Sequence, residues 1–122
     1  LSKKLIQIGI RTMNHHQLEQ ANKYKVQVID MKNFESNIKL DFNGPVYISI
    51  DLDGLDPSFA PGVSHPEPGG LSTRDVLSIV SDVKEDVIGA DIVEYNPKKD
   101  LNNITAITAA KFLKELSSKL LA

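Results

Sequence analysis

The stretch VYISIDLDGLDPSFAPGVSHPEPGGLS, residues 46–72, decides the fold of this chain. It begins as an apolar run rich in Ile and Val, which predicts a buried β-strand. The run ends in aspartates at positions 51, 53 and 56, and a loop dense in Pro and Gly follows directly. Negative charge therefore gathers where a buried strand leaves its sheet, and something must neutralise it.

The side chains of a strand alternate between its two faces, and this alternation sorts the segment. One face carries Tyr47, Ser49, Asp51 and Asp53, and the other carries Val46, Ile48, Ile50 and Leu52. The first face becomes acidic toward the end of the strand. Strand geometry places the Cα atoms of Asp51 and Asp53 about 7 Å apart.

Two carboxylates this close repel each other, so one tends to be protonated unless a cation sits between them. Their oxygens suit a hard or borderline divalent ion such as Mg²⁺ or Mn²⁺. Because Asp-x-Asp is a short and common pattern, its spacing leaves two interpretations equally open. Asp51 and Asp53 bind a metal, or they cap loop amides and pair with Arg or Lys. Asp56 precedes Pro57, where a turn is favoured over metal ligation.

Strands and helices alternate along the chain. Strands are predicted at residues 5–10, 26–30, 45–53 and 86–94. Helices are predicted after the N-cap residues Asn14 and Ser72, and over residues 105–120. The last helix is expected to turn Ile107, Ala110, Leu113, Leu116 and Leu120 toward the core. This alternation predicts a parallel sheet in α/β layers, with ligands beyond the carboxyl ends of its strands.

Two further residues fall at that edge of the sheet. Glu94 ends the last strand within GADIVEYNP, and it lies near the aspartates only if the two strands are neighbours. A cationic substrate would relieve the added repulsion, but hydrogen bonds from loop amides explain Glu94 equally well. His65 lies in the stiff loop, where a solvated histidine is slightly favoured over a catalytic role. Asp91 has the opposite strand parity from Glu94 and is expected to be structural.

Composition narrows the classes of function. With 122 residues, the chain suits one small domain or half of a larger one. A net charge of −2 gives no sign of a nucleic-acid or membrane partner, and the lack of cysteine excludes disulfides and thiolate metal sites. The N-terminal apolar stretch is too short for a secretion signal, which leaves a cytoplasmic or organellar location open. Because the chain begins with Leu1, we expect a C-terminal fragment of a longer protein.

Three segments, SIDLDGLDPSFAPGVSHPEPGGLS, GADIVEYNP and TAITAAKFLKEL, together resemble the C-terminal part of the ureohydrolase family, the arginases and agmatinases. The resemblance is clear from residue 46 onward, and IGIR at residues 8–11 also matches a strand of the family. It implies a three-layer α/β/α fold with a parallel sheet, of which residues 1–122 form the C-terminal portion. It also implies hydrolysis of a guanidino group to an amine and urea at a site with two Mn²⁺ ions.

The resemblance also implies roles for individual residues. Asp51 would bridge the two Mn²⁺ ions and Asp53 would ligate one of them. Glu94 would pair with the guanidinium of a small cationic substrate, and the loop through Ser64 and His65 would border the mouth of the site. The family's other metal ligands lie in D-x-H-x-D and G-G-x-H motifs, which this sequence lacks. We therefore expect the chain alone to bind manganese poorly and to be inactive, and the intact protein to be a homo-oligomer.

The substrate stays open at this point. HPEPGG, residues 65–70, resembles agmatinases and plant-type arginases more than animal arginases, which weakens an assignment to arginine itself. Agmatine and arginine are the two candidate substrates. One alternative is a hydrolase of the same fold that acts on another guanidino or formimino compound. Another is a non-catalytic α/β module whose aspartates only cap loops.

Overall fold

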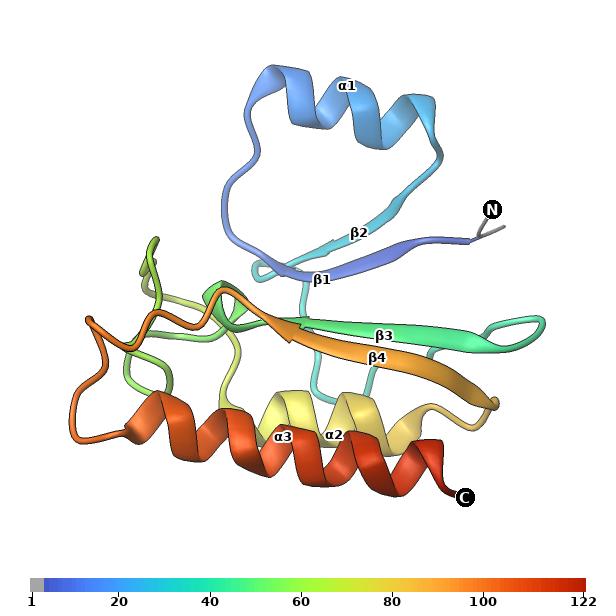
Figure 1. Cartoon of the computed structure of the whole chain (residues 1–122). Helices are drawn as coiled ribbons and strands as arrows, with labels where there is room; N and C mark the ends of the chain where they lie inside the picture. Colours follow the sequence, from blue (N-terminus) through green and yellow to red (C-terminus); the bar gives the residue numbers. More distant parts are fainter. Residues whose placement is uncertain (1–3) are drawn as a thin grey trace.

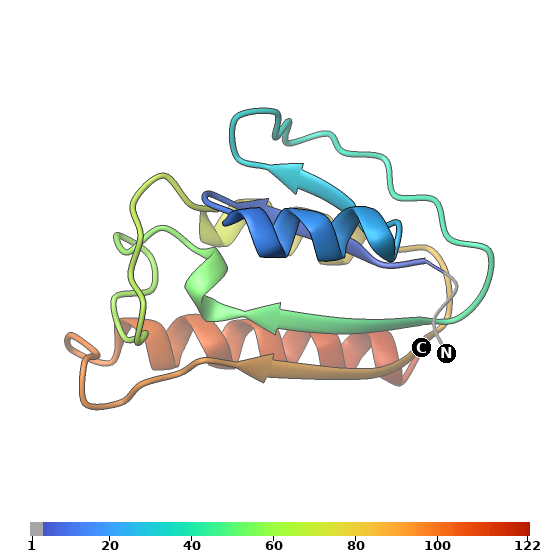
Figure 2. The ribbon, with the colours of Figure 1, turned by 90° about the horizontal axis from the view of Figure 1, so that it is seen from above.

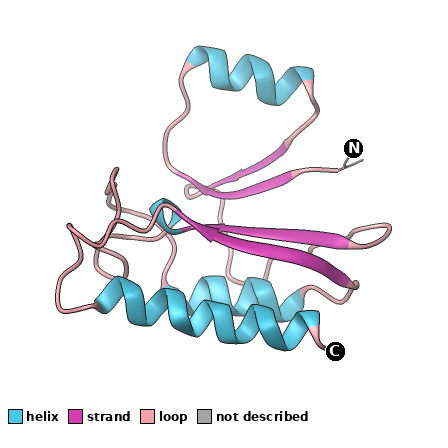
Figure 3. Ribbon diagram, in the orientation of Figure 1, coloured by secondary structure: helices cyan, strands magenta, loops and turns pink. Residues whose placement is uncertain are grey.

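The computed structural model describes residues 4–122, and Figure 3 colours its helices and strands. In chain order the elements are β1 (Ile6–Ile10), α1 (His15–Lys23), β2 (Gln27–Asp30), β3 (Val46–Asp51), the 3₁₀ helix η1 (Leu52–Gly54), α2 (Thr73–Asp82), β4 (Val87–Val93) and α3 (Ile104–Leu120). Every predicted strand and α-helix is present, with bounds shifted by one or two residues. Asn14 and Ser72 cap their helices as predicted, and each forms a capping box with the residue three positions later.

The elements form layers (Figure 1). Helix α1 lies on one side of the strands, and α2 and α3 pack against each other on the other side. Strand β1 pairs with β2 and β3 pairs with β4, both in parallel. This arrangement confirms the predicted α/β class with parallel strands between helices.

Between residues 4 and 122 the strand pairs form two separate sheets, order β1-β2 and order β3-β4. A cavity of about 650 Å³ lies between them, lined by consecutive residues of β1 and β3. Figure 2 shows these two strands running alongside each other without pairing. Each strand therefore turns an unpaired edge toward the cavity, and such edges invite a further strand or association with other chains.

The main core lies between the β3–β4 sheet and the two helices beneath it. Its buried members are Ile50, Leu52, Leu55, Ala60, Val63, Leu71, Val76, Val80, Phe112 and Leu116. Leu52 and Phe112 are completely inaccessible to solvent. Because Leu52 and Leu55 flank the acidic turn after β3, hydrophobic burial holds that turn in place. Within the described residues, no helix is both long and apolar enough to cross a membrane.

Helix α3 packs on the core with a different face from the predicted one. Its buried residues are Thr105, Thr108, Phe112 and Leu116, and of the predicted set only Leu116 is among them. Ile107, Ala110, Leu113 and Leu120 are exposed. The prediction was wrong because threonines occupy the buried face. The Gly62 N–H donates to Thr105 Oγ1 at 2.7 Å, so this polar side chain is satisfied without water.

That bond gives a first prediction. Thr105→Val keeps the shape of the side chain but leaves the Gly62 N–H without an acceptor, which costs about 1–3 kcal/mol in the free energy of unfolding. Thr105→Ser retains the hydroxyl and serves as the control. Urea-induced unfolding of the protein measures both. Equal midpoints for the valine and serine variants would contradict the assignment.

Candidate metal and substrate site

The parallel pairing of β3 and β4 brings their carboxyl ends together. Asp51 stands opposite Val93 in the register, so Glu94 follows directly across from the end of β3. The condition for Glu94 to lie near the aspartates, that the two strands be neighbours, is therefore met. The acidic residues belong to one edge of one sheet.

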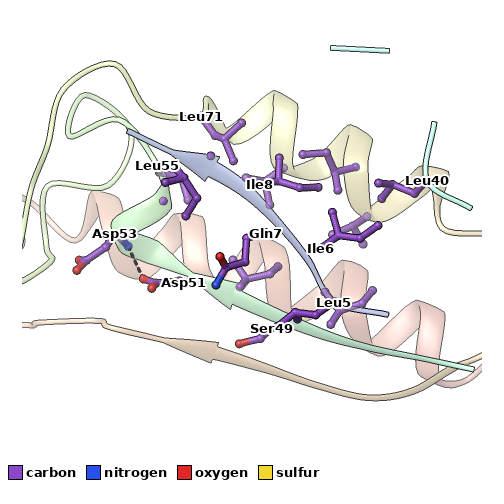
Figure 4. Close-up of a pocket in the computed structure, with 18 of the residues that line it drawn as sticks. Leu5, Ile6, Gln7, Ile8, Leu40, Ser49, Asp51, Asp53, Leu55 and Leu71 are labelled. Carbon is purple, nitrogen blue, oxygen red and sulfur yellow. Dashed lines mark hydrogen bonds between the residues drawn. The ribbon is translucent and has the colours of Figure 1, made fainter. Parts of the chain in front are cut away.

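Strand β3 ends at Asp51, two residues earlier than predicted. The Asp51 carboxylate accepts a hydrogen bond from the Asp53 N–H at 2.8 Å and so caps η1 (Figure 4). An N-terminal cap of this kind starts a helical turn in place of further strand. The expectation that Asp53 continues the strand alternation was thus wrong, because Asp53 is carried by η1.

Asp53 meets two residues from other elements. Ligand atoms of Asp53, His65 and Glu94 lie within 4.8 Å of one another. Asp53 Oδ2 is 3.5 Å from His65 Nδ1, beyond a strong hydrogen bond. Asp53 Oδ1 is buried and has no hydrogen-bond partner in the described part of the chain. Carboxylate oxygens suit Mn²⁺, and the buried Asp53 oxygen calls for a ligand, so Asp53 fits a metal ion, while Glu94 and His65 stand exposed beside it.

Asp51 stands beside this cluster and not within it. Although the residue is exposed overall, desolvation raises the pKa of its carboxyl, and the charges of Asp53 and Glu94 act in the same direction. The hydrogen bond from the Asp53 N–H and the charge of Arg11 oppose them, and the net shift is upward. The protein groups therefore leave the negative charge only partly compensated, and a cation would stabilise the ionised form.

Glu94 has an unusual backbone conformation. Its φ angle is 66°, in the left-handed region that is uncommon for residues other than Gly. Among residues 4–122, no loop amide donates a hydrogen bond to its carboxylate. Strained backbone of this kind is concentrated at functional sites. Glu94 thus presents an exposed, uncapped carboxylate next to Asp53 and His65.

The Pro/Gly loop that carries His65 is pinned at several points. Asp56 accepts hydrogen bonds from the Ser58 N–H at 2.9 Å, the Ser58 hydroxyl at 2.6 Å and the Gly69 N–H at 2.7 Å. A Cβ atom at Gly70 would lie 2.6 Å from the Asp56 nitrogen, so only glycine permits this close approach. The turn role predicted for Asp56 is confirmed, and the loop forms a fixed wall beside the acidic edge.

Two residues near the site received no functional role from the sequence. Asp91 accepts hydrogen bonds from the hydroxyls of Tyr47 at 3.0 Å and Ser49 at 2.5 Å, which confirms its structural role. Arg11, directly after β1, donates to the main-chain carbonyls of Asp53 and Gly54. The sequence signal that could have indicated a role for Arg11 was its position as a single arginine at the end of an apolar strand.

Parallel strands between helices, with carboxylates and a histidine at the carboxyl edge, define an α/β protein of the class that binds ligands at this edge. The family model described as the Arginase family matches residues 1–118, and the chain belongs to this family.

Individual relatives agree with this membership. The chain is 47% identical over 127 residues to "Arginase 1, mitochondrial" of Arabidopsis thaliana, covering 98% of this chain and 37% of that protein. It is 38% identical over 113 residues to an agmatinase of Chromobacterium violaceum, covering 88% of this chain and 35% of that protein. A solved structure, a triple mutant of a T. brucei arginase-like protein bound with Mn²⁺, superimposes with a TM-score of 0.90. It is 36% identical, and the match covers 98% of this chain and 43% of that one. The chain thus spans well under half the length of these relatives.

The pinned loop gives a prediction for pH dependence. The hydrogen bonds from Ser58 and Gly69 lower the pKa of Asp56 from 3.8 to about 2. A lowered pKa stabilises the fold fully above the unfolded value, and the contribution is lost as pH falls from about 4 toward 2. The difference in urea midpoint between the wild type and Asp56→Asn should therefore shrink over that range. A difference that stays constant down to the lowest pH at which both proteins fold would contradict it.

The left-handed backbone of Glu94 gives another. Glu94→Gly relieves about 1–2 kcal/mol of strain and loses about 0.5–1 kcal/mol to chain entropy. The free energy of unfolding of the metal-free protein should therefore rise by about 0.5–1 kcal/mol. Val93→Gly, at the preceding strand position, is the control and should lower it by about 1 kcal/mol. Equal losses of stability in the two variants would show that Glu94 is unstrained.

Proposed function

We propose that the full-length protein containing this chain is a manganese-dependent hydrolase that splits a small guanidino compound into an amine and urea. Residues 1–122 would form the C-terminal portion of its catalytic domain. The observation that carries the proposal is the acidic edge of the β3–β4 sheet, where a buried Asp53 oxygen has no hydrogen-bond partner in the part of the chain that the structure describes. Membership of the Arginase family and the Mn²⁺-bound triple mutant of the T. brucei arginase-like protein support it.

The metal would be held by the residues that follow β3. Asp51, at the end of the strand, would bridge two Mn²⁺ ions, and Asp53, on η1, would ligate one. When bound, such a pair supplies a hydroxide nucleophile at neutral pH by lowering the pKa of a water. The remaining ligands would come from D-x-H-x-D and G-G-x-H motifs outside this chain. The chain by itself should therefore bind manganese poorly and should not turn over substrate.

The substrate would be held by Glu94. Its carboxylate is exposed and uncapped, and it lies next to Asp53, so a guanidinium bound to it would sit beside the metal ligands. Charge-assisted hydrogen bonds would fix both the position and the orientation of the planar cation. The left-handed backbone at Glu94 fits this role, since it turns the side chain out of the strand alternation. His65, with an 85% exposed side chain, would border the entrance.

Substrate identity needs a direct assay. The relatives include an arginase and an agmatinase, and both activities release urea from a guanidinium group. Urea release by the Mn²⁺-loaded full-length protein should be measured in parallel with arginine, agmatine and guanidinobutyrate. The proposal would be overturned if none of the guanidino compounds released urea, whether or not a formimino compound was turned over.

Two further properties of the protein are proposed. We expect it to be a homo-oligomer. The mitochondrial name of the Arabidopsis relative supports an organellar location.

Asp51→Asn tests the metal. The amide keeps the size of the side chain but removes the charge that would bridge the ions, so bound Mn²⁺ and urea release should fall together. Metal analysis and a urea assay on the full-length protein measure this. Asp56→Asn is the control, because the Asp56 carboxylate accepts hydrogen bonds within the loop and has no proposed role toward the metal. Near-normal turnover by Asp51→Asn would favour the interpretation that Asp51 only caps the Asp53 amide.

Glu94→Gln tests the substrate site. Here Mn²⁺ content should be unchanged, whereas loss of one partner of an ion pair costs about 2–5 kcal/mol, or roughly 30-fold or more in kcat/KM. Steady-state kinetics at saturating Mn²⁺ measure the effect. Unchanged kinetics would show that no guanidinium binds to Glu94.

A further inference from the structure

Arg11 reaches from the end of β1 to the turn that carries Asp53. Its Nη1 donates to the Gly9 carbonyl at 3.0 Å and to the Gly54 carbonyl at 2.7 Å. Its Nη2 donates to the carbonyl of Asp53. The half-buried guanidinium thus bonds two successive carbonyls of η1, forty-odd residues away along the chain.

A bulge in β1 aims Arg11 at this turn. The register with β2 shifts between Ile8 and Ile10, which leaves Gly9 as the extra residue. Gly9 has a φ of 89°, and a Cβ atom there would lie 2.8 Å from Leu71 Cδ1. This φ favours glycine, because any other residue would be strained there, and bulges commonly redirect the side chains that follow them. The local sequence Gly-Ile-Arg is therefore built to bring Arg11 to η1.

The hydrogen bonds of the Arg11 guanidinium are not part of a salt bridge, and a lysine could not make them. Within residues 4–122, no carboxylate lies within 4.0 Å of Arg11 in an ion pair. Its Nε is buried and has no hydrogen-bond partner among the described residues, which costs stability, so the position of the side chain depends on the bonds of its two Nη atoms. The planar fork matches two adjacent carbonyls, whereas an ammonium is a point donor.

Asp53 is consequently fixed through both of its main-chain groups. Its N–H donates to Asp51 at 2.8 Å, and its carbonyl accepts from Arg11. Only the side-chain torsions of Asp53 remain, and they direct the carboxylate toward His65 and Glu94. A carboxylate on a turn held at both ends is preorganised for a ligand that needs a defined position.

We propose that Arg11 is a positioning residue for Asp53. By clamping the carbonyls of η1, it holds the Asp53 carboxylate where it meets a divalent cation. The inference rests on the proposed function in that the cation is Mn²⁺. It adds a residue that directly follows β1 to the support of the site at the ends of β3 and β4.

The test uses the full-length protein with Arg11→Lys and Arg11→Gln. Arg74→Lys, at an exposed position on α2, is the matched control. Mn²⁺ affinity is measured from the electron paramagnetic resonance signal of free Mn²⁺, and backbone mobility from amide exchange of peptides covering residues 50–56 in the metal-free protein. Loss of a supporting contact weakens metal binding roughly 10- to 100-fold. We expect that loss, with faster exchange confined to residues 50–56, in both Arg11 variants and not in the control.

The outcomes separate the inference from the proposed function. If the wild type binds Mn²⁺ and releases urea while Arg11→Lys binds Mn²⁺ equally well, the positioning role is overturned and the function stands. If the wild type binds no Mn²⁺, the proposed function fails, and with it the role of Arg11 toward a metal. If, in addition, amide exchange of residues 50–56 is the same in the Arg11 variants as in the wild type, Arg11 does not hold η1 in place. Faster exchange throughout the protein, with a lower Tm, would show a general structural role and would also overturn the proposal.

Discussion

The site depends on the parallel pairing of β3 with β4. This pairing places Asp51 opposite Val93, so the acidic residues at the ends of the two strands lie at the same edge of the sheet. The core beneath supports the pairing, because Leu52 and Leu55 anchor the turn between Asp51 and the loop. A shift of one residue in register would turn the acidic side chains toward the core, where unpaired carboxylates are strongly unfavourable. The hydrophobic pattern of β3 therefore also fixes the geometry of the charges.

Charge at that edge is compensated only in part by the protein. The Arg11 guanidinium contacts the turn, yet its hydrogen bonds go to carbonyls, and the pKa of Asp51 stays raised. Among residues 4–122, a buried Asp53 oxygen has no hydrogen-bond partner, and no amide caps the carboxylate of Glu94, which lies on a left-handed backbone. A sheet edge built for stability alone would pair these groups. The arrangement instead favours external cations, with a metal at the aspartates and a guanidinium at Glu94.

Much of this could be predicted from the sequence, because the relevant signals were local. Alternation, capping boxes and the Asp-Pro turn each depend on a few adjacent residues, and they gave the layers, α1, α2 and the role of Asp56. The misses have a shared cause. The buried face of α3 depends on a hydrogen bond between Thr105 and distant Gly62, and Arg11 bonds carbonyls, which every residue type carries. The cap that ends β3 at Asp51 is local, but the pattern Asp-x-Asp is compatible both with a cap and with a strand that continues.

The most direct test of the central claim is anomalous diffraction from crystals of the full-length protein grown with Mn²⁺, recorded at the manganese absorption edge. Two anomalous peaks are expected a few ångströms apart, both within bonding distance of the Asp51 carboxylate and one of them also bound by Asp53, with Glu94 facing them across the substrate space. A protein that crystallises with Mn²⁺ and shows no peak within bonding distance of Asp51 and Asp53 would contradict it.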